Sequence, residues 1–131
     1  MGIYLNPDSD RYERLCNSPI FVDKSLLIEY TNKAINTSND CICVTRPRRF
    51  GKSTDANMLV AYYSRGTNSK DLFNTLNISH CPSFLEHLNK HNVIHLNIQD
   101  FLSTTNSIDE MLLKITRMIL KDLKFEFKDV I

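Results

Sequence analysis

The chain has 131 residues, of which 42% are hydrophobic and 24% charged, and this size and composition predict one globular domain over residues 1–131. Sixteen basic residues against fifteen acidic ones leave a net charge of +1, which excludes recruitment of nucleic acid or membranes by the protein's overall field. No apolar run approaches the roughly 18 residues of a membrane span, and the polar start MGIYLNPDSDRYER is unlike a secretory signal. We therefore expect a cytoplasmic protein with reduced cysteines.

The first regular elements are expected in PIFVDKSLLIEYTNKAINTSND, residues 19–40, as a short extended piece that leads into a helix. Asp23 is the expected N-cap. One apolar face recurs at helical spacing, at Leu26, Leu27, Tyr30 and Ala34. CICVT at residues 41–45 is apolar and β-branched, which predicts a buried strand of a parallel sheet.

A second helix is expected to begin near Lys52, and Gly66 marks its end. Its apolar stripe is Ala56, Leu59, Val60 and Tyr63. KDLFNTLNI and SFLEHLNKH read as two more short helices, and VIHLNI at residues 93–98 as a second strand. Two strands joined through helices imply a parallel pair with a right-handed crossover, so the predicted fold class is α/β.

A long helix is predicted in the last part of the chain, where Ser107 and Glu110 have the spacing of a capping box. Its continuous apolar face comprises Ile108, Met111, Leu112, Ile115, Met118 and Ile119. Two strands cannot cover such a face together with the other helices. We therefore expect exposed strand edges, low stability and self-association, relieved in a longer chain that supplies further strands.

The segment CVTRPRRFGKST carries the clearest chemical signal, because it ends in the Gly-Lys-Ser of a phosphate-binding loop between the predicted strand and helix. Arg46 stands where such a loop has its first glycine. The phosphate cradle is made by backbone N–H groups that lead into the helix, so the loss of that glycine leaves the donors in place. The expected nucleotide-binding residues are Arg49, Phe50, Gly51, Lys52, Ser53 and Thr54, with the Ser53 hydroxyl as a Mg²⁺ ligand.

These segments resemble the AAA-ATPase-like family of P-loop proteins, which are often joined to a nuclease-like C-terminal domain of the PD-(D/E)XK type. RPRRFGKS at residues 46–53 is similar to that family's own Walker A variant, arginine included. FVDKS, DLFNTLNI and VIHLNIQDF resemble three further family segments in the same order. The resemblance implies ATP and Mg²⁺ as cofactors and a P-loop core of parallel strands with flanking helices, of which the chain is the N-terminal part.

The chain departs from the family pattern after its second predicted strand. Hydrolysis needs an acidic residue that holds magnesium and polarises water, and the resemblance places that Walker B strand beyond the sequence. Asp100 is one candidate magnesium ligand, but the next residue is Phe101, where an acidic partner is expected. The alternative is that Asp100 caps a turn. We expect hydrolysis to be weak or absent in this chain, and whether it is an enzyme stays open.

Two other functions remain open. Arg46, Arg48, Arg49 and Lys52 form a basic loop that could bind nucleic-acid phosphates, although the net charge does not support it. A plain interaction domain with a vestigial loop would bind neither ATP nor nucleic acid. His87 and His91 could ligate a metal if they share a helical face, or they could simply lie on the wet face of a short helix.

Overall fold

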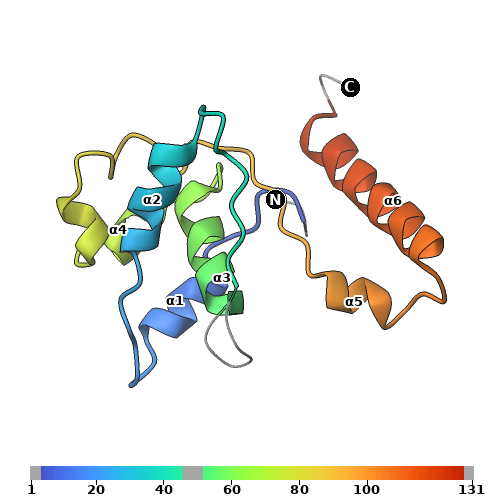
Figure 1. Ribbon diagram of the computed structural model, residues 1–131, viewed down its shortest axis with the longest axis horizontal. Helices are drawn as coiled ribbons and strands as arrows, with labels where there is room; N and C mark the ends of the chain where they lie inside the picture. Colours follow the sequence, from blue (N-terminus) through green and yellow to red (C-terminus); the bar gives the residue numbers. More distant parts are fainter. Residues whose placement is uncertain (1–3, 46–51, 129–131) are drawn as a thin grey trace.

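The computed structural model describes residues 4–45 and 52–128, apart from the side chain of Lys52, and it is mainly helical (Figure 1). The helices are α1 (Asp10–Cys16), α2 (Leu26–Ala34), α3 (Lys52–Tyr63), α4 (Lys70–Phe73), the 3-10 turn η1 (Asn77–His80), α5 (Ile98–Leu102) and α6 (Ile108–Glu126).

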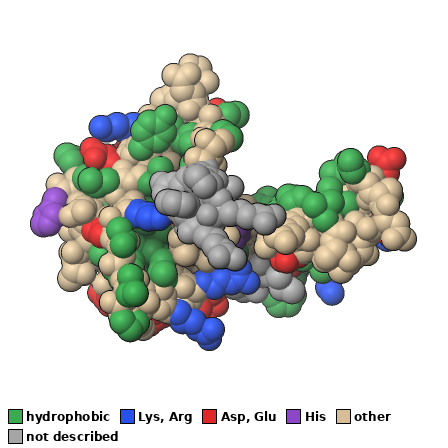
Figure 2. Space-filling model, turned by 60° about the horizontal axis from the view of Figure 1, so that its bottom comes forward, with side chains coloured by type: hydrophobic (Ala, Val, Ile, Leu, Met, Phe, Trp, Pro, Cys, Tyr) green, Lys and Arg blue, Asp and Glu red, His purple; other side chains and the backbone are tan. Residues whose placement is uncertain are grey.

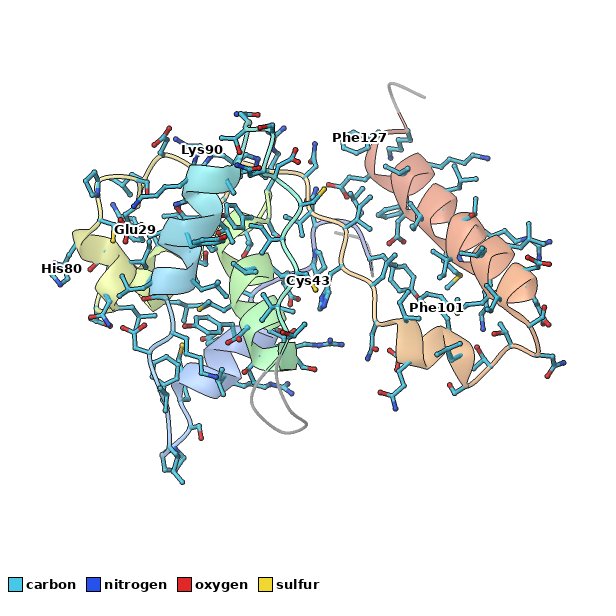
Figure 3. All side chains as sticks on the ribbon, viewed as in Figure 1. Glu29, Cys43, His80, Lys90, Phe101 and Phe127 are labelled. Atoms are coloured by element: carbon cyan, nitrogen blue, oxygen red, sulfur yellow. The ribbon has the colours of Figure 1, made fainter. Side chains whose placement is uncertain are left out.

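Two separate groups of buried side chains hold these elements together. The larger core contains side chains from all four helices α1, α2, α3 and α4. In it, the rings of Tyr12 and Phe73 stack with their centroids 5.2 Å apart, and the Tyr62 ring lies edge-on to Phe73. The smaller core joins α5 to α6 through Phe101, Met111 and Ile115. Figures 1 and 3 show the result, with α1 to α4 grouped on one side, α5 and α6 on the other, and Phe101 on α5 beside α6.

The predicted α/β core of parallel strands is wrong for the residues that the structure describes. These residues form no sheet, and their β-pairing is limited to two isolated bridges, Leu5 with Ile94 (antiparallel) and Ser64 with His91 (parallel). Residues 41–45 run extended and exposed, including Cys43, which Figure 3 shows beside the chain that leads to α5.

The hydrogen bonds around residues 93–95 give the physical reason. Val93 O accepts from Asn6 N at 2.7 Å, and His95 N donates to Tyr4 O at 2.9 Å, so the N-terminal segment occupies the positions that a neighbouring strand would take. The Asp122 carboxylate of α6 fixes that segment by accepting from Tyr4 N at 2.7 Å and from Leu5 N. Residues 41–45 are in no bridge in the described parts of the chain, and the isolated pairing of residues 4–6 with residues 93–95 is at best marginally stable.

Helix α2 buries a different face from the predicted one. Leu26 and Tyr30 are 51% and 64% exposed, whereas Ile28, Thr31 and Asn32 are buried. The polar pair is buried because Thr31 Oγ1 bonds to the Tyr63 hydroxyl and Asn32 Nδ2 donates to the Tyr62 hydroxyl. Buried polar groups are stable when they are hydrogen-bonded in this way.

The prediction of Asp23 as the N-cap of α2 is wrong, because Ser25 is the N-cap and Asp23 lies two residues before it. The helix begins at Leu26 after Ser25, and the Asp23 side chain accepts from the backbone N–H groups of Ser25 and Asn77, both at 2.8 Å. Asp23 therefore ties the start of α2 to η1.

Asn89 lies in the segment SFLEHLNKH, where a short helix was predicted. Residues 82–90 form turns instead, because Asn89 adopts a left-handed backbone conformation with φ of +55°. Its side-chain amide donates to the carbonyl oxygens of Ala61 and Ser64 at 3.2 and 3.0 Å, and its Oδ1 accepts from Ser69 N at 3.1 Å. Asn89 thus caps the C-terminal end of α3.

The long helix α6 begins as predicted, since Ser107 Oγ accepts from Glu110 N at 3.2 Å. The Glu110 carboxylate accepts from Asn106 N rather than from Ser107 N. Only Met111 and Ile115 of the predicted apolar face are buried, and Figure 2 shows hydrophobic side chains on the surface of this part. No helix in the described parts of the chain is long and apolar enough to cross a membrane.

Candidate functional site

The candidate site lies at the first turn of α3, which starts at Lys52 directly after the Gly-Lys-Ser glycine. Ser53 is exposed and Thr54 half-buried in that turn. The predicted donors Arg49, Phe50 and Gly51 lie outside the described residues. The first N–H groups of any helix lack acceptors within the helix, and its dipole favours an anion there. The predicted helix after the loop is thus confirmed, while the predicted strand before it is not formed.

An ion pair between the half-buried Lys24 and the buried Asp55 connects this turn to the FVDKS segment. Asp55 is only 4% exposed, and its carboxylate lies 3.7 Å from the Lys24 ammonium. The structure therefore brings FVDKS against the start of α3. The resemblance implied such a position, because FVDKS is similar to a family segment that lies near the loop. Sequence reasoning missed Asp55, although an acidic residue in the first turn of a helix is a recognisable signal.

A hollow of about 170 Å³ opens on the Lys24 side of α3. Its walls are mostly apolar and include the Tyr12 ring, while Lys24, Thr54 and Asp55 add polar groups at one end. Burial raises the pKa of Tyr12, which keeps its hydroxyl neutral. The remaining lining residues are Leu15, Ile20, Val22 and Met58.

A second hollow of about 240 Å³ opens at Ser53 and is more polar. Its lining residues come from α1, from α3 and from the chain that leads into α5: Arg11, Ser53, Ala56, Asn57, His95, Leu96, Asn97 and Ile98. Burial, and then the positive charge of Arg11, lower the pKa of His95 below 6.5. Among its described lining residues, this hollow therefore has the positive charge of Arg11 and several neutral hydrogen-bonding groups at neutral pH.

The comparison with protein families decides the assignment. The family model described as "Predicted AAA-ATPase" matches residues 10–130, which is nearly the whole chain. The chain belongs to this AAA-ATPase-like family. No significant match is found among curated proteins or among solved structures.

The family assignment confirms the resemblance that RPRRFGKS and FVDKS indicated, and it is consistent with nucleotide binding in general. In this AAA-ATPase-like protein Ser53 is exposed in the first turn of α3, and the hollow beside it is lined by hydrogen-bonding groups.

Asp100, the candidate magnesium ligand, lies in the first turn of the short helix α5 and is exposed. Asn97 caps that helix by accepting from Gln99 N at 3.2 Å, so Asp100 does not cap a turn. Asp100 is not among the residues that line the hollow at Ser53. The structure therefore gives no support to its role as a ligand.

His87 and His91 do come together, but through the turn at Asn89 and not on a helix. His87 Nδ1 and His91 Nε2 lie 2.9 Å apart as a hydrogen-bonded pair, and the His91 ring packs edge-on to Tyr63. Burial, followed by the charges of His87 and Arg65, lowers the pKa of His91. Among the described residues no group of three or more possible metal ligands is found.

Proposed function

We propose that this AAA-ATPase-like protein binds a nucleoside triphosphate, ATP, together with Mg²⁺ through the RPRRFGKS loop and the first turn of α3. The observation that carries the proposal is the start of α3 at Lys52, which puts the N-terminal turn of a helix, whose dipole favours an anion, directly after the glycine of the Gly-Lys-Ser sequence. Family membership supports it independently.

Each residue of the loop has a proposed role. The backbone N–H groups of residues 49–53 donate to the phosphate oxygens, and the Lys52 ammonium contributes a charge-assisted bond. The Ser53 hydroxyl, which is on the surface of the turn, ligates Mg²⁺, and Thr54 follows it in the same turn. When bound, Mg²⁺ neutralises charge on the phosphates.

We propose that the base lies in the mostly apolar hollow on the other side of this turn. Tyr12 and Val22 provide apolar surface for a planar ring, and the Lys24–Asp55 pair offers both a donor and an acceptor at one end. The hollow shares Thr54 with the proposed phosphate site, so one ligand can extend from one to the other.

Hydrolysis is proposed to be weak or absent in this chain. Within the described parts of the chain, the lining of the hollow at Ser53 contains asparagine and histidine side chains but no Asp or Glu. A general base for water has to lie within hydrogen-bond reach of it.

Isothermal titration of the purified chain with ATP, with and without Mg²⁺, tests the proposal. We expect Mg²⁺-dependent binding that Lys52→Ala weakens by about tenfold or more, because a charge-assisted bond is worth about 1.5–3 kcal/mol. Lys70→Ala is the matched control, since Lys70 is exposed on α4 and should leave the affinity unchanged. Equal affinities of wild type and Lys52→Ala would contradict the site.

The two alternatives give different results in the same experiment. Binding of a polynucleotide that falls steeply with salt and ignores Mg²⁺ would favour the basic loop as a nucleic-acid site. Binding of neither ligand would favour an interaction domain with a vestigial loop.

A further inference from the structure

The hollow at Ser53 has a composition that suits an anionic group. Its polar side chains come from three separate parts of the chain, and Ser53 and Asn57 lie four residues apart on the same face of α3. The lining includes the Arg11 guanidinium and has no carboxylate to compete for it.

Arg11 is held at this hollow by the packing of α1. The next residue, Tyr12, is 2% exposed, and its ring stacks on Phe73 in the larger core. This anchors the helix, while Arg11 itself faces solvent at the edge of the hollow. His95 lines the same hollow, and burial, followed by the positive charge of Arg11, lowers the pKa of its imidazole. No ion pair between Arg11 and an acidic residue is found in the described parts of the chain.

We propose that Arg11 binds the terminal phosphate of a nucleoside triphosphate and thereby makes the site prefer a triphosphate to a diphosphate. The inference rests on the proposed function, because it takes Ser53 to hold the Mg²⁺ that bridges the last two phosphates. A terminal phosphate next to Ser53 faces the hollow that Ser53 lines. A guanidinium is suited to this role because its planar donors bind two phosphate oxygens at once.

His95 is the other titratable side chain that lines this hollow, but its lowered pKa leaves the imidazole neutral at physiological pH. It can donate or accept one hydrogen bond, whereas the added negative charge of a triphosphate requires a cation. Arg11 therefore discriminates between the two nucleotides, and His95 does not.

The test compares Mg²⁺-ATP and Mg²⁺-ADP affinities for wild type, Arg11→Ala, Arg11→Lys and Arg14→Ala by isothermal titration. Arg14 is an equally exposed arginine on the same helix, outside the lining of the hollow, so its substitution removes the same charge without the contact. We expect Arg11→Ala to weaken ATP about tenfold and ADP less than about twofold. Arg11→Lys should recover part of the ATP affinity, and Arg14→Ala should change neither.

Four results would overturn the proposal. Equal losses of ATP and ADP affinity in Arg11→Ala, or the same loss in Arg14→Ala, would show a general electrostatic effect. An unchanged ATP affinity in Arg11→Ala would refute the contact while leaving the nucleotide site in place. A wild-type chain that binds neither nucleotide would refute the nucleotide site itself, and this proposal with it.

Discussion

Asn89 offers the sharpest test of how α3 is held in place. Asn89→Ala removes the side-chain bonds to Ala61 O, Ser64 O and Ser69 N, which are 3.0–3.2 Å long. Three such bonds contribute about 0.5–1.5 kcal/mol each. An alanine at the φ of +55° adds about 1–2 kcal/mol of strain, part of which asparagine also carries. We expect the free energy of unfolding to fall by about 3 kcal/mol.

Asn89→Gly separates the two contributions, because glycine tolerates the positive φ but also lacks the side chain. We expect it to lose less stability than Asn89→Ala, by about 0.5–1 kcal/mol. The assay is urea unfolding followed by far-UV circular dichroism. Asn74→Ala is the control, because Asn74 is exposed with an ordinary helical φ of −57°. A change within about 0.5 kcal/mol in Asn89→Ala, as expected for the control, would refute the capping role.

Two further predictions concern acid stability and self-association. Burial alone would raise the pKa of Asp23, but the hydrogen bonds from Ser25 and the Asn77 backbone lower it below 3.8 overall. Its stabilisation is therefore present above the unfolded pKa of about 3.9 and is lost as the pH falls through the folded value. Asp23→Asn should reduce the free energy of unfolding at pH 7 more than at pH 3, and equal reductions would contradict the bonding of Asp23. On α6, Leu113 is 58% exposed, and we expect association at micromolar concentration that Leu113→Lys reduces in sedimentation velocity. Leu85→Lys is the control because Leu85 is 54% exposed outside α6, and a monomeric wild type would count against the prediction.

Helices that begin with a strong local signal were predictable from the sequence. Ser107 caps α6 as expected because an N-cap bond is made within four residues of chain. The start of α3 at Lys52 was expected for a similar reason, since the loop signature and the apolar residues after it lie next to one another.

Features that depend on distant partners were not predictable. Thr31 and Asn32 are polar, and hydrogen bonds with the distant hydroxyls of Tyr63 and Tyr62 help to make their burial favourable. The predicted strand at residues 93–98 is wrong: its only pairing among the described residues is a single bridge to residues 4–6, some 90 positions away, and Asn97 and Ile98 instead begin α5. The Lys24–Asp55 pair also joins segments that no local pattern connects.

The central claim, that phosphate binds at the start of α3, is tested most directly by the backbone amide resonances of the protein in ¹H–¹⁵N NMR. Addition of Mg²⁺-ATP should shift the amide signals of Lys52 and Ser53 strongly, because their N–H groups would donate to phosphate, and the signal of the neighbouring Thr54 should shift with them. Signals of residues 82–90, at the opposite end of α3, should stay in place. Unchanged signals at Ser53 and Thr54 under saturating nucleotide, or shifts confined to another surface, would contradict the account.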